Sequence, residues 1–223
     1  MDAAPANEKG HEDDHEGGSH RRPRPRIETL ADLIFGLSLG IDSIALIPTT
    51  GLTPFDMNVR LLGFAFAFLF VITAWVIYST YASVLPMDES IVTFLNIGLL
   101  LLVALIPYLL NTVIIALNDP IGDYSSSLFA TDLTCILVIL AVFAHILGRE
   151  DNHLIPHDSM PLFRSGRNRM VVLAVIMVAS IVPPFWTWRF DGVPLRLYLW
   201  TLPLISYWAG RAVRPASRTY RLR

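Results

Sequence analysis

Charge is scarce in this sequence, and its scarcity argues against a soluble fold. Only 16% of the 223 residues are charged, whereas 53% are hydrophobic, and the mean hydropathy is +0.52. A soluble domain of this length carries more charge and shorter apolar runs. Several apolar runs here approach or exceed the roughly 20 residues that cross a hydrocarbon core. The composition therefore predicts an integral membrane protein.

Cysteine is almost absent, and so are the usual motifs of catalysis. The single cysteine, Cys135, stands in an apolar run, which excludes an intrachain disulfide and argues against a thiolate metal site. The sequence shows no nucleophile paired with a base, no glycine-rich phosphate loop and no spaced cluster of metal ligands. We therefore expect neither an enzyme nor an obligatory cofactor or metal. The polar first 26 residues also show no apolar signal region.

The remaining chain divides into a polar tail, six apolar segments and a basic end. The apolar segments span about 27–47, 58–84, 90–117, 124–147, 168–188 and 194–213, with a longer polar connection at 148–167. They predict an all-α membrane protein with six transmembrane helices at 26–213. Residues 1–25 hold His11, His15 and His20 among acids, and we interpret them as a disordered, solvated cytoplasmic tail rather than a metal site. Residues 214–223 form a basic cytoplasmic tail suited to anionic lipid rather than to nucleic acid.

The positive charges predict the orientation of the helices. If the N-terminus is cytoplasmic, fourteen lysines and arginines fall inside and only Arg60, Arg189 and Arg196 fall outside. Cytoplasmic segments carry the excess of Lys and Arg in membrane proteins. We therefore predict a multi-pass protein of the cell membrane with both termini in the cytoplasm.

The first apolar segment carries two acids, Asp32 and Asp42. A carboxylate at the centre of a bilayer costs at least about 3 kcal/mol, so such residues usually face a bundle interior or water. Counted at about 1.5 Å per residue, Trp75, Tyr78 and Asn96 lie at the depth of Asp32, and all three side chains can donate hydrogen bonds to it. We predict a polar cluster of Asp32, Trp75, Tyr78 and Asn96 near the cytoplasmic face, with Arg26 as a nearby counter-charge.

Two interpretations of this cluster remain open. It can be an interhelical lock, which we favour because a satisfied buried carboxylate need not titrate. Alternatively, it positions the first helix around a conduction path, or Asp32 itself takes up protons.

The two faces of the first segment differ in character. At 100° per residue, Leu33, Leu37, Gly40, Ile41 and Ile44 share one broad stripe. The acids Asp32 and Asp42 lie on the other side together with Ser38. Such a stripe is most often lipid-facing or packing surface. If copies of the helix met around an axis, it would form a narrow, dewetting constriction.

Short motifs of the sequence resemble the transmembrane protein 175 family of cation channels. Arg26-x-x-x-Leu30-Ala31-Asp32 is similar to the Arg-x-x-x-Phe-Ser-Asp signature of the family's first helix. Trp75-x-x-Tyr78 corresponds to a Trp-x-x-His, and Asn96 and Pro107 follow in the third segment. Leu30, Ala31 and Tyr78 depart from the signature, which keeps only its Arg and Asp. The resemblance covers about 26–213, one six-helix unit.

The resemblance implies a function and an assembly. Members are potassium-permeable channels, and prokaryotic ones form homotetramers in which the first helix lines the pore and no Thr-Val-Gly-Tyr-Gly filter is present. It implies that Leu37 forms the constriction, that Leu33, Gly40, Ile41 and Ile44 share the pore lining, and that K⁺ or another monovalent cation permeates. Gly40 replaces a pore-lining Thr of the family, so a hydroxyl layer is missing.

Two alternatives belong to other classes of protein. One is a proton-coupled carrier that binds its proton on Asp32 or Asp42. The other is a non-conducting membrane scaffold of the same fold. Membrane lipids are partners in every case, and nucleic acid in none.

Overall fold

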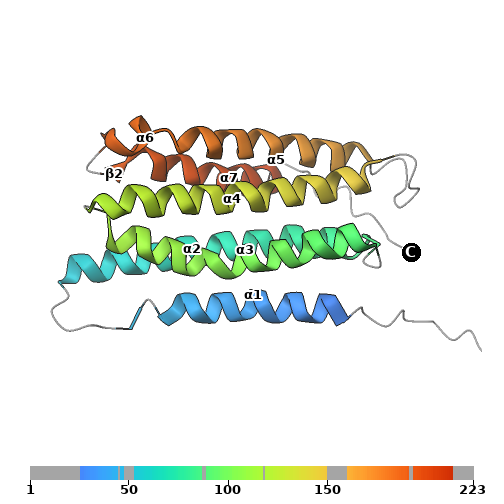
Figure 1. Cartoon of the computed structure of the whole chain (residues 1–223), viewed down its shortest axis with the longest axis horizontal. Coiled ribbons are helices and arrows are strands. Elements are labelled where there is room, and N and C mark those ends of the chain that lie inside the picture. Colours follow the sequence, from blue (N-terminus) through green and yellow to red (C-terminus); the bar gives the residue numbers. More distant parts are fainter. Residues whose placement is uncertain are drawn as a thin grey trace, which may run out of the picture.

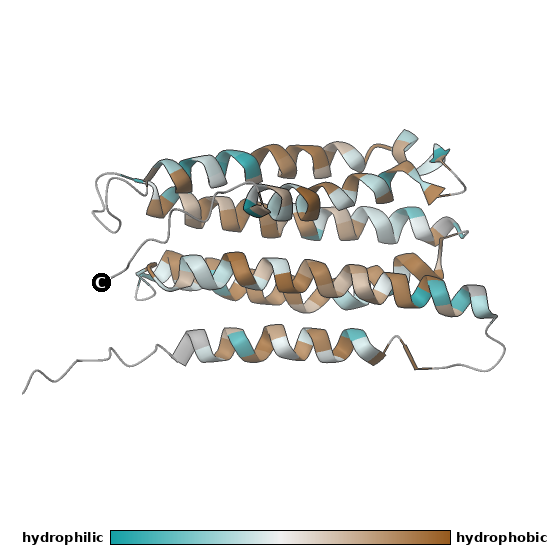
Figure 2. Cartoon of the chain, turned by 180° about the vertical axis from the view of Figure 1, so that it is seen from behind, coloured by the Kyte–Doolittle hydropathy of each residue, from teal (hydrophilic) through white to brown (hydrophobic). Residues whose placement is uncertain are grey.

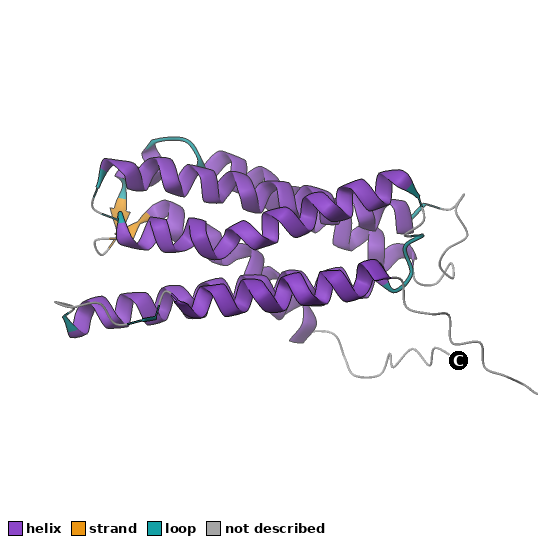
Figure 3. Ribbon diagram, turned by 60° about the horizontal axis from the view of Figure 1, so that its bottom comes forward, coloured by secondary structure: helices purple, strands orange, loops and turns teal. Residues whose placement is uncertain are grey.

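The computed structural model describes residues 26–44, 46–47, 53–86, 89–117, 119–149, 160–190 and 193–212. Within these ranges the chain is a helical bundle with one long helix for each predicted segment (Figure 1). The helices are α1 (Arg26–Ile44), α2 (Pro54–Ala82), α3 (Ser90–Ile115), α4 (Pro120–Leu147), α5 (Met160–Ser180), the short α6 (Pro184–Thr187) and α7 (Leu195–Ala212). A small antiparallel pair, β1 (Arg189–Phe190) and β2 (Val193–Pro194), lies at one end of the bundle (Figure 3).

The long helices run nearly parallel to one another and alternate in direction along the chain (Figure 1). Helix α1 packs against α2 and α3 at one side of the bundle. Helices α4 and α5 form the most extensive pair, and α7 packs against α5 on the opposite side from α1. The chain therefore has an α1–α2–α3 half and an α4–α5–α7 half, joined mainly by the contact of α3 with α4.

Local sequence fixes where helices α2 and α4 begin. Thr53 and Asp56 form a capping box, in which the Asp56 backbone N–H donates to Thr53 Oγ1 at 3.2 Å and the Thr53 N–H donates to Asp56 Oδ2 at 3.0 Å. Helix α4 has Asp119 at its N-cap and Pro120 at its first position. Proline is tolerated there because the first N–H groups of a helix lack intrahelical partners anyway.

Three described helices are long and apolar enough to cross a membrane by themselves. They cover Asp56–Ala82, Ser90–Ile115 and Ile121–Leu147. Helices α1, α5 and α7 also lie along the bundle axis but contain more polar residues, most clearly at the start of α5 (Figure 2). The chain is thus an all-helical, multi-pass membrane protein apart from its two-residue strands.

The predicted boundaries of the fifth segment are wrong at both ends. Helix α5 begins at Met160, so the second half of the predicted polar connection is helical, and it ends at Ser180 before the separate helix α6. Polar contacts explain the early start. Arg164 Nε donates to the Gly148 carbonyl oxygen at 3.3 Å, and Arg167 Nη1 lies 3.0 Å from Nδ1 of His145. Hydropathy marks only the apolar part of a helix, so it missed this polar extension.

Aromatic side chains join the two halves in the core. The ring of Phe129 on α4 lies 6.1 Å from that of Phe70 on α2 and 4.5 Å from that of Trp200 on α7, measured between ring centroids. The described arginines separate between the two ends of the bundle. Arg60, Arg189 and Arg196 lie near one end, whereas the arginines of 149–169 lie after α4 and in the first half of α5, toward the other end, where Arg211 closes α7. Which end is cytoplasmic stays a prediction, and the tails at 1–25 and 213–223 lie outside the described residues.

Candidate functional site

The buried face of α1 is narrow and partly polar. Ala31, Phe35, Ser38 and Asp42 recur at helical spacing and are all less than 5% exposed. These residues form the face that packs on α2 and α3. Ser38 and Asp42 therefore lie on the packed face of the helix, opposite the apolar stripe.

The opposite face of α1 is apolar and uncovered. Leu33, Leu37 and Ile44 are 67%, 60% and 59% exposed, and Ile41 and Gly40 are exposed between them. A Cβ added to Gly36 or Gly40 would meet nothing within 4 Å. No described residue of the chain packs over this stripe, which runs along most of the helix at the edge of the bundle (Figure 1).

A hydrogen bond joins α1 to α2 near the start of α1. Trp75 Nε1 donates to Asp32 Oδ1 at 3.0 Å, so the structure brings these two residues of the predicted cluster together. Asp32 differs from our expectation in being exposed rather than enclosed, because it stands one position beyond the buried Ala31. The side chain of Arg26, the expected counter-charge, lies outside the described part of the structure.

The other two members of the predicted cluster lie in the core instead. Tyr78 is buried, and its ring packs on Phe35 with centroids 5.6 Å apart. Asn96 on α3 is fully buried, and neither its amide nitrogen nor its amide oxygen has a hydrogen-bond partner among the described residues. Asn96 therefore makes no hydrogen bond to Asp32 in the described structure, because its side chain is buried in the packed interior.

Two buried acids lack the partners that their burial calls for. In the described structure, Asp42 Oδ2 and both carboxylate oxygens of Asp132 have no hydrogen-bond partner. The neighbouring hydroxyls are used elsewhere: Ser38 donates to the Ile34 carbonyl at 2.9 Å, and Thr134 donates to the Ala130 carbonyl at 2.7 Å. A buried ionised carboxylate in this state is costly.

Sequence reasoning missed a buried arginine, which it counted only as an outside charge. Arg196 on α7 is fully buried, and its Nε donates to the Ser180 carbonyl at 2.7 Å while Nη2 donates to the Ile181 carbonyl at 2.9 Å. Its Nη1 lies 2.9 Å from Asp123 Oδ1. The remaining partners are the Asp123 carbonyl, the hydroxyls of Ser126 and Ser127 and the face of the Trp186 ring. The available signal was an arginine inside the sixth apolar segment, since such a residue needs partners.

Metal-ligating side chains do not gather in the described structure. No group of three or more His, Cys, Asp or Glu side chains in it is placed to hold a metal ion. The histidines of the tail, His11, His15 and His20, lie outside the described residues.

Comparison with known proteins identifies the fold. No protein-family model matches the sequence, and no curated protein matches it. Among solved structures, the chain is similar to the crystal structure of a lysosomal potassium-selective channel TMEM175 homologue from Chamaesiphon minutus. The TM-score is 0.60 at 16% sequence identity, over 85% of this chain and 97% of the other.

At 16% sequence identity, this structural similarity shows that the two chains share a fold. The resemblance to the transmembrane protein 175 family predicted from short motifs is confirmed as a structural resemblance over most of the chain. The protein that shares this fold is an ion channel and not an enzyme.

Proposed function

We propose that the chain is one subunit of a potassium-permeable cation channel whose pore is lined by α1. The observation that carries the proposal is the uncovered apolar stripe of Leu33, Leu37, Gly40, Ile41 and Ile44 on a helix at the edge of the bundle. A fold shared with a potassium-selective channel supports it.

The shape of α1 favours contact with further copies of the chain. Gly36 and Gly40 leave open space on the exposed side of α1, and small residues four apart allow another helix to approach closely. The exposed Asp32 carboxylate also favours contact between copies of the chain. A carboxylate that faces lipid is costly, and a neighbouring subunit would shield it from lipid. A closed ring of four subunits gives each α1 such a neighbour and encloses a path along the axis.

The chemistry of the stripe suits a gate rather than a binding site. Its side chains offer a cation no ligand, so a narrow ring of them stops ions by excluding water. Leu37 is the proposed constriction. In this arrangement Asp32, held by Trp75, positions α1 against α2 and does not line the narrowest point.

Potassium uptake into liposomes tests the proposal. The wild type is compared with Leu37→Ala and with Val175→Ala, a control that is 63% exposed on α5 at the other side of the bundle. We expect faster uptake through Leu37→Ala, because a wider constriction hydrates more easily, and no change in Val175→Ala. Valinomycin gives the full uptake of the vesicles. Equal rates in all three proteins would contradict the placement of the gate, and silence in all three would contradict the channel.

A proton-coupled carrier is the second candidate, and one observation favours it. Asp42 is buried on α1 with one carboxylate oxygen unpartnered among the described residues. Asp42→Asn in the same liposomes separates the two functions. It abolishes substrate-linked proton movement in a carrier, whereas a channel keeps its potassium flux.

A further inference from the structure

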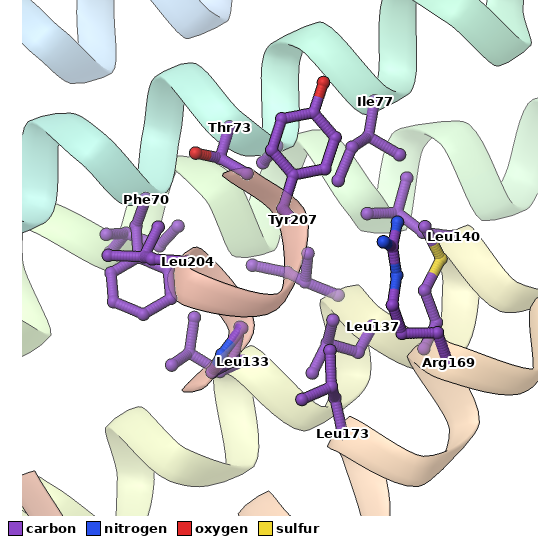
Figure 4. A pocket seen from close by; sticks show the side chains of 15 residues that line it. Phe70, Thr73, Ile77, Leu133, Leu137, Leu140, Arg169, Leu173, Leu204 and Tyr207 are labelled. Carbon is purple, nitrogen blue, oxygen red and sulfur yellow. The ribbon is translucent and has the colours of Figure 1, made fainter. Parts of the chain in front are cut away.

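Two adjoining cavities lie near the end of the bundle where α2 and α7 end and α5 begins. The outer cavity has a volume of about 150 Å³ and the deeper one about 50 Å³. Both are bounded by Ile77, Arg169, Met170 and Tyr207, so the two adjoin at these side chains. Figure 4 shows Tyr207 and Arg169 entering this space from α7 and α5.

The deeper cavity is almost entirely apolar. It lies between α2, α4, α5 and α7, and aliphatic side chains such as Leu133, Leu137 and Leu204 form its wall (Figure 4). Ala74 on α2 is the smallest residue of this lining, so a larger side chain at this position would project into the cavity. Such a slot fits a hydrocarbon chain and offers water almost no hydrogen bond.

The outer cavity carries positive charge that no acid of the described residues pairs with. Arg169 Nη1 donates to the Ser206 carbonyl at 3.3 Å, and Arg211 Nη1 donates to the Tyr207 hydroxyl at 3.3 Å. No carboxylate of the described residues forms a salt bridge with either arginine. The nearby Arg167 differs in that each of its guanidinium nitrogens has a side-chain partner. Asn168 accepts hydrogen bonds from two of them, and Nδ1 of His145 lies 3.0 Å from the third.

Two arginines without a carboxylate partner among the described residues, together with an apolar slot, identify the kind of ligand. A hydrocarbon chain fills the slot, and a negative group satisfies the guanidinium groups at its mouth. A neutral lipid leaves the charges unmatched, and a free anion leaves the slot empty. Arg211 and Thr80 are exposed at the mouth, so a molecule of the surrounding bilayer reaches it directly.

We propose that this pair of cavities binds an anionic phospholipid. Its phosphate lies between Arg169 and Arg211, and the end of one acyl chain enters the slot beside Ala74. The site lies away from α1, so it does not depend on the proposed pore. A lipid held there contacts α2, α5 and α7 at once and ties the two halves of the bundle together.

Native mass spectrometry of the full chain in detergent tests the proposal. Dioleoyl phosphatidylglycerol and dioleoyl phosphatidylcholine are titrated into wild type, Arg211→Gln and Ala74→Phe. The control is Arg167→Gln, which removes the same charge at the same end of the bundle but outside the two cavities. Arg211 is exposed, so Arg211→Gln should fold like the wild type. Thermal melting checks that Ala74→Phe is folded as well.

We expect phosphatidylglycerol to bind more tightly than phosphatidylcholine. Arg211→Gln should weaken its binding about fivefold, the effect of one basic residue at a membrane surface. Ala74→Phe should weaken it as well by filling the slot, and Arg167→Gln should leave it unchanged.

Three results would overturn the proposal. Equal binding of the two lipids would remove the role of charge. An equal loss in Arg167→Gln would show general surface attraction. Full competition by glycerol phosphate, which has no acyl chain, would show that the slot holds nothing, and this last test needs no variant.

Discussion

Replacing Arg196 by alanine should destabilise the protein more than any exposed arginine does. The guanidinium is fully buried and donates to the carbonyls of Ser180, the last residue of α5, and of Ile181 just after it, as well as to Asp123 on α4. Arg196 therefore fastens α7 to both neighbouring helices at one end of the bundle. Its removal leaves several acceptors without a donor.

The size of the effect follows from these partners. The carbonyls of Ser180 and Ile181 stand at a helix end, where no intrahelical donor replaces the guanidinium. Each buried acceptor left unpaired costs about 1–3 kcal/mol. The ion pair adds little, because the Asp123 side chain is 44% exposed and solvent screens it. We expect a loss of about 3–5 kcal/mol in the free energy of unfolding.

Unfolding in dodecyl maltoside with increasing dodecyl sulfate, followed by tryptophan fluorescence, measures this loss. Arg60→Ala, on α2 at the same end of the bundle, is the control and should change stability by less than about 1 kcal/mol. Asp123→Asn should fall between the two. Equal stability of Arg196→Ala and Arg60→Ala would refute the reasoning, since the buried donors would then carry no net energy.

The same assay checks two further changes. Trp75→Phe should cost about 1 kcal/mol by removing the donor to Asp32, and the cost should vanish in an Asp32→Leu background; an undiminished cost would assign the effect to packing. Gly122→Ala should lower the free energy of unfolding by about 1–3 kcal/mol, because its Cβ would lie 2.1 Å from the Ala116 carbonyl oxygen. Gly98→Ala is the control and should not destabilise the protein, since its Cβ would meet only a side-chain methyl at 3.8 Å. Similar stability of the two glycine variants would contradict the close approach at Gly122.

The sequence predicted the parts of the structure that depend on local patterns. Apolar length located one long helix for each segment, and helical periodicity separated the exposed stripe of Leu37 from the buried face of Asp42. Depth counting along adjacent helices placed Trp75 beside Asp32. These arguments work because a membrane helix has a fixed rise and a fixed repeat.

Helix length, periodicity and depth could not predict the contacts between segments that are distant in the sequence. Counting depth says nothing of the direction of Asn96 around α3, and that direction places its side chain in the core. The hydrogen-bond partners of Arg196 come from α4 and from the end of α5 and the residue after it, some 70 and 16 residues earlier in the chain, and no local motif links them. The polar first turns of α5 are helical because Arg164 and Arg167 find partners on and just after α4, which hydropathy does not record.

The division of the bundle into two halves has a consequence for synthesis of the chain. Helix α1 leaves the ribosome before α2 and α3, yet these two helices carry the surfaces that cover its buried face. A lone α1 would present Asp42 to the lipid, which is costly. Stable insertion of α1 therefore awaits the two helices that follow it. A chain truncated after α1 should therefore insert poorly and be a substrate for quality-control proteases, whereas one that includes α2 and α3 covers the buried face of α1.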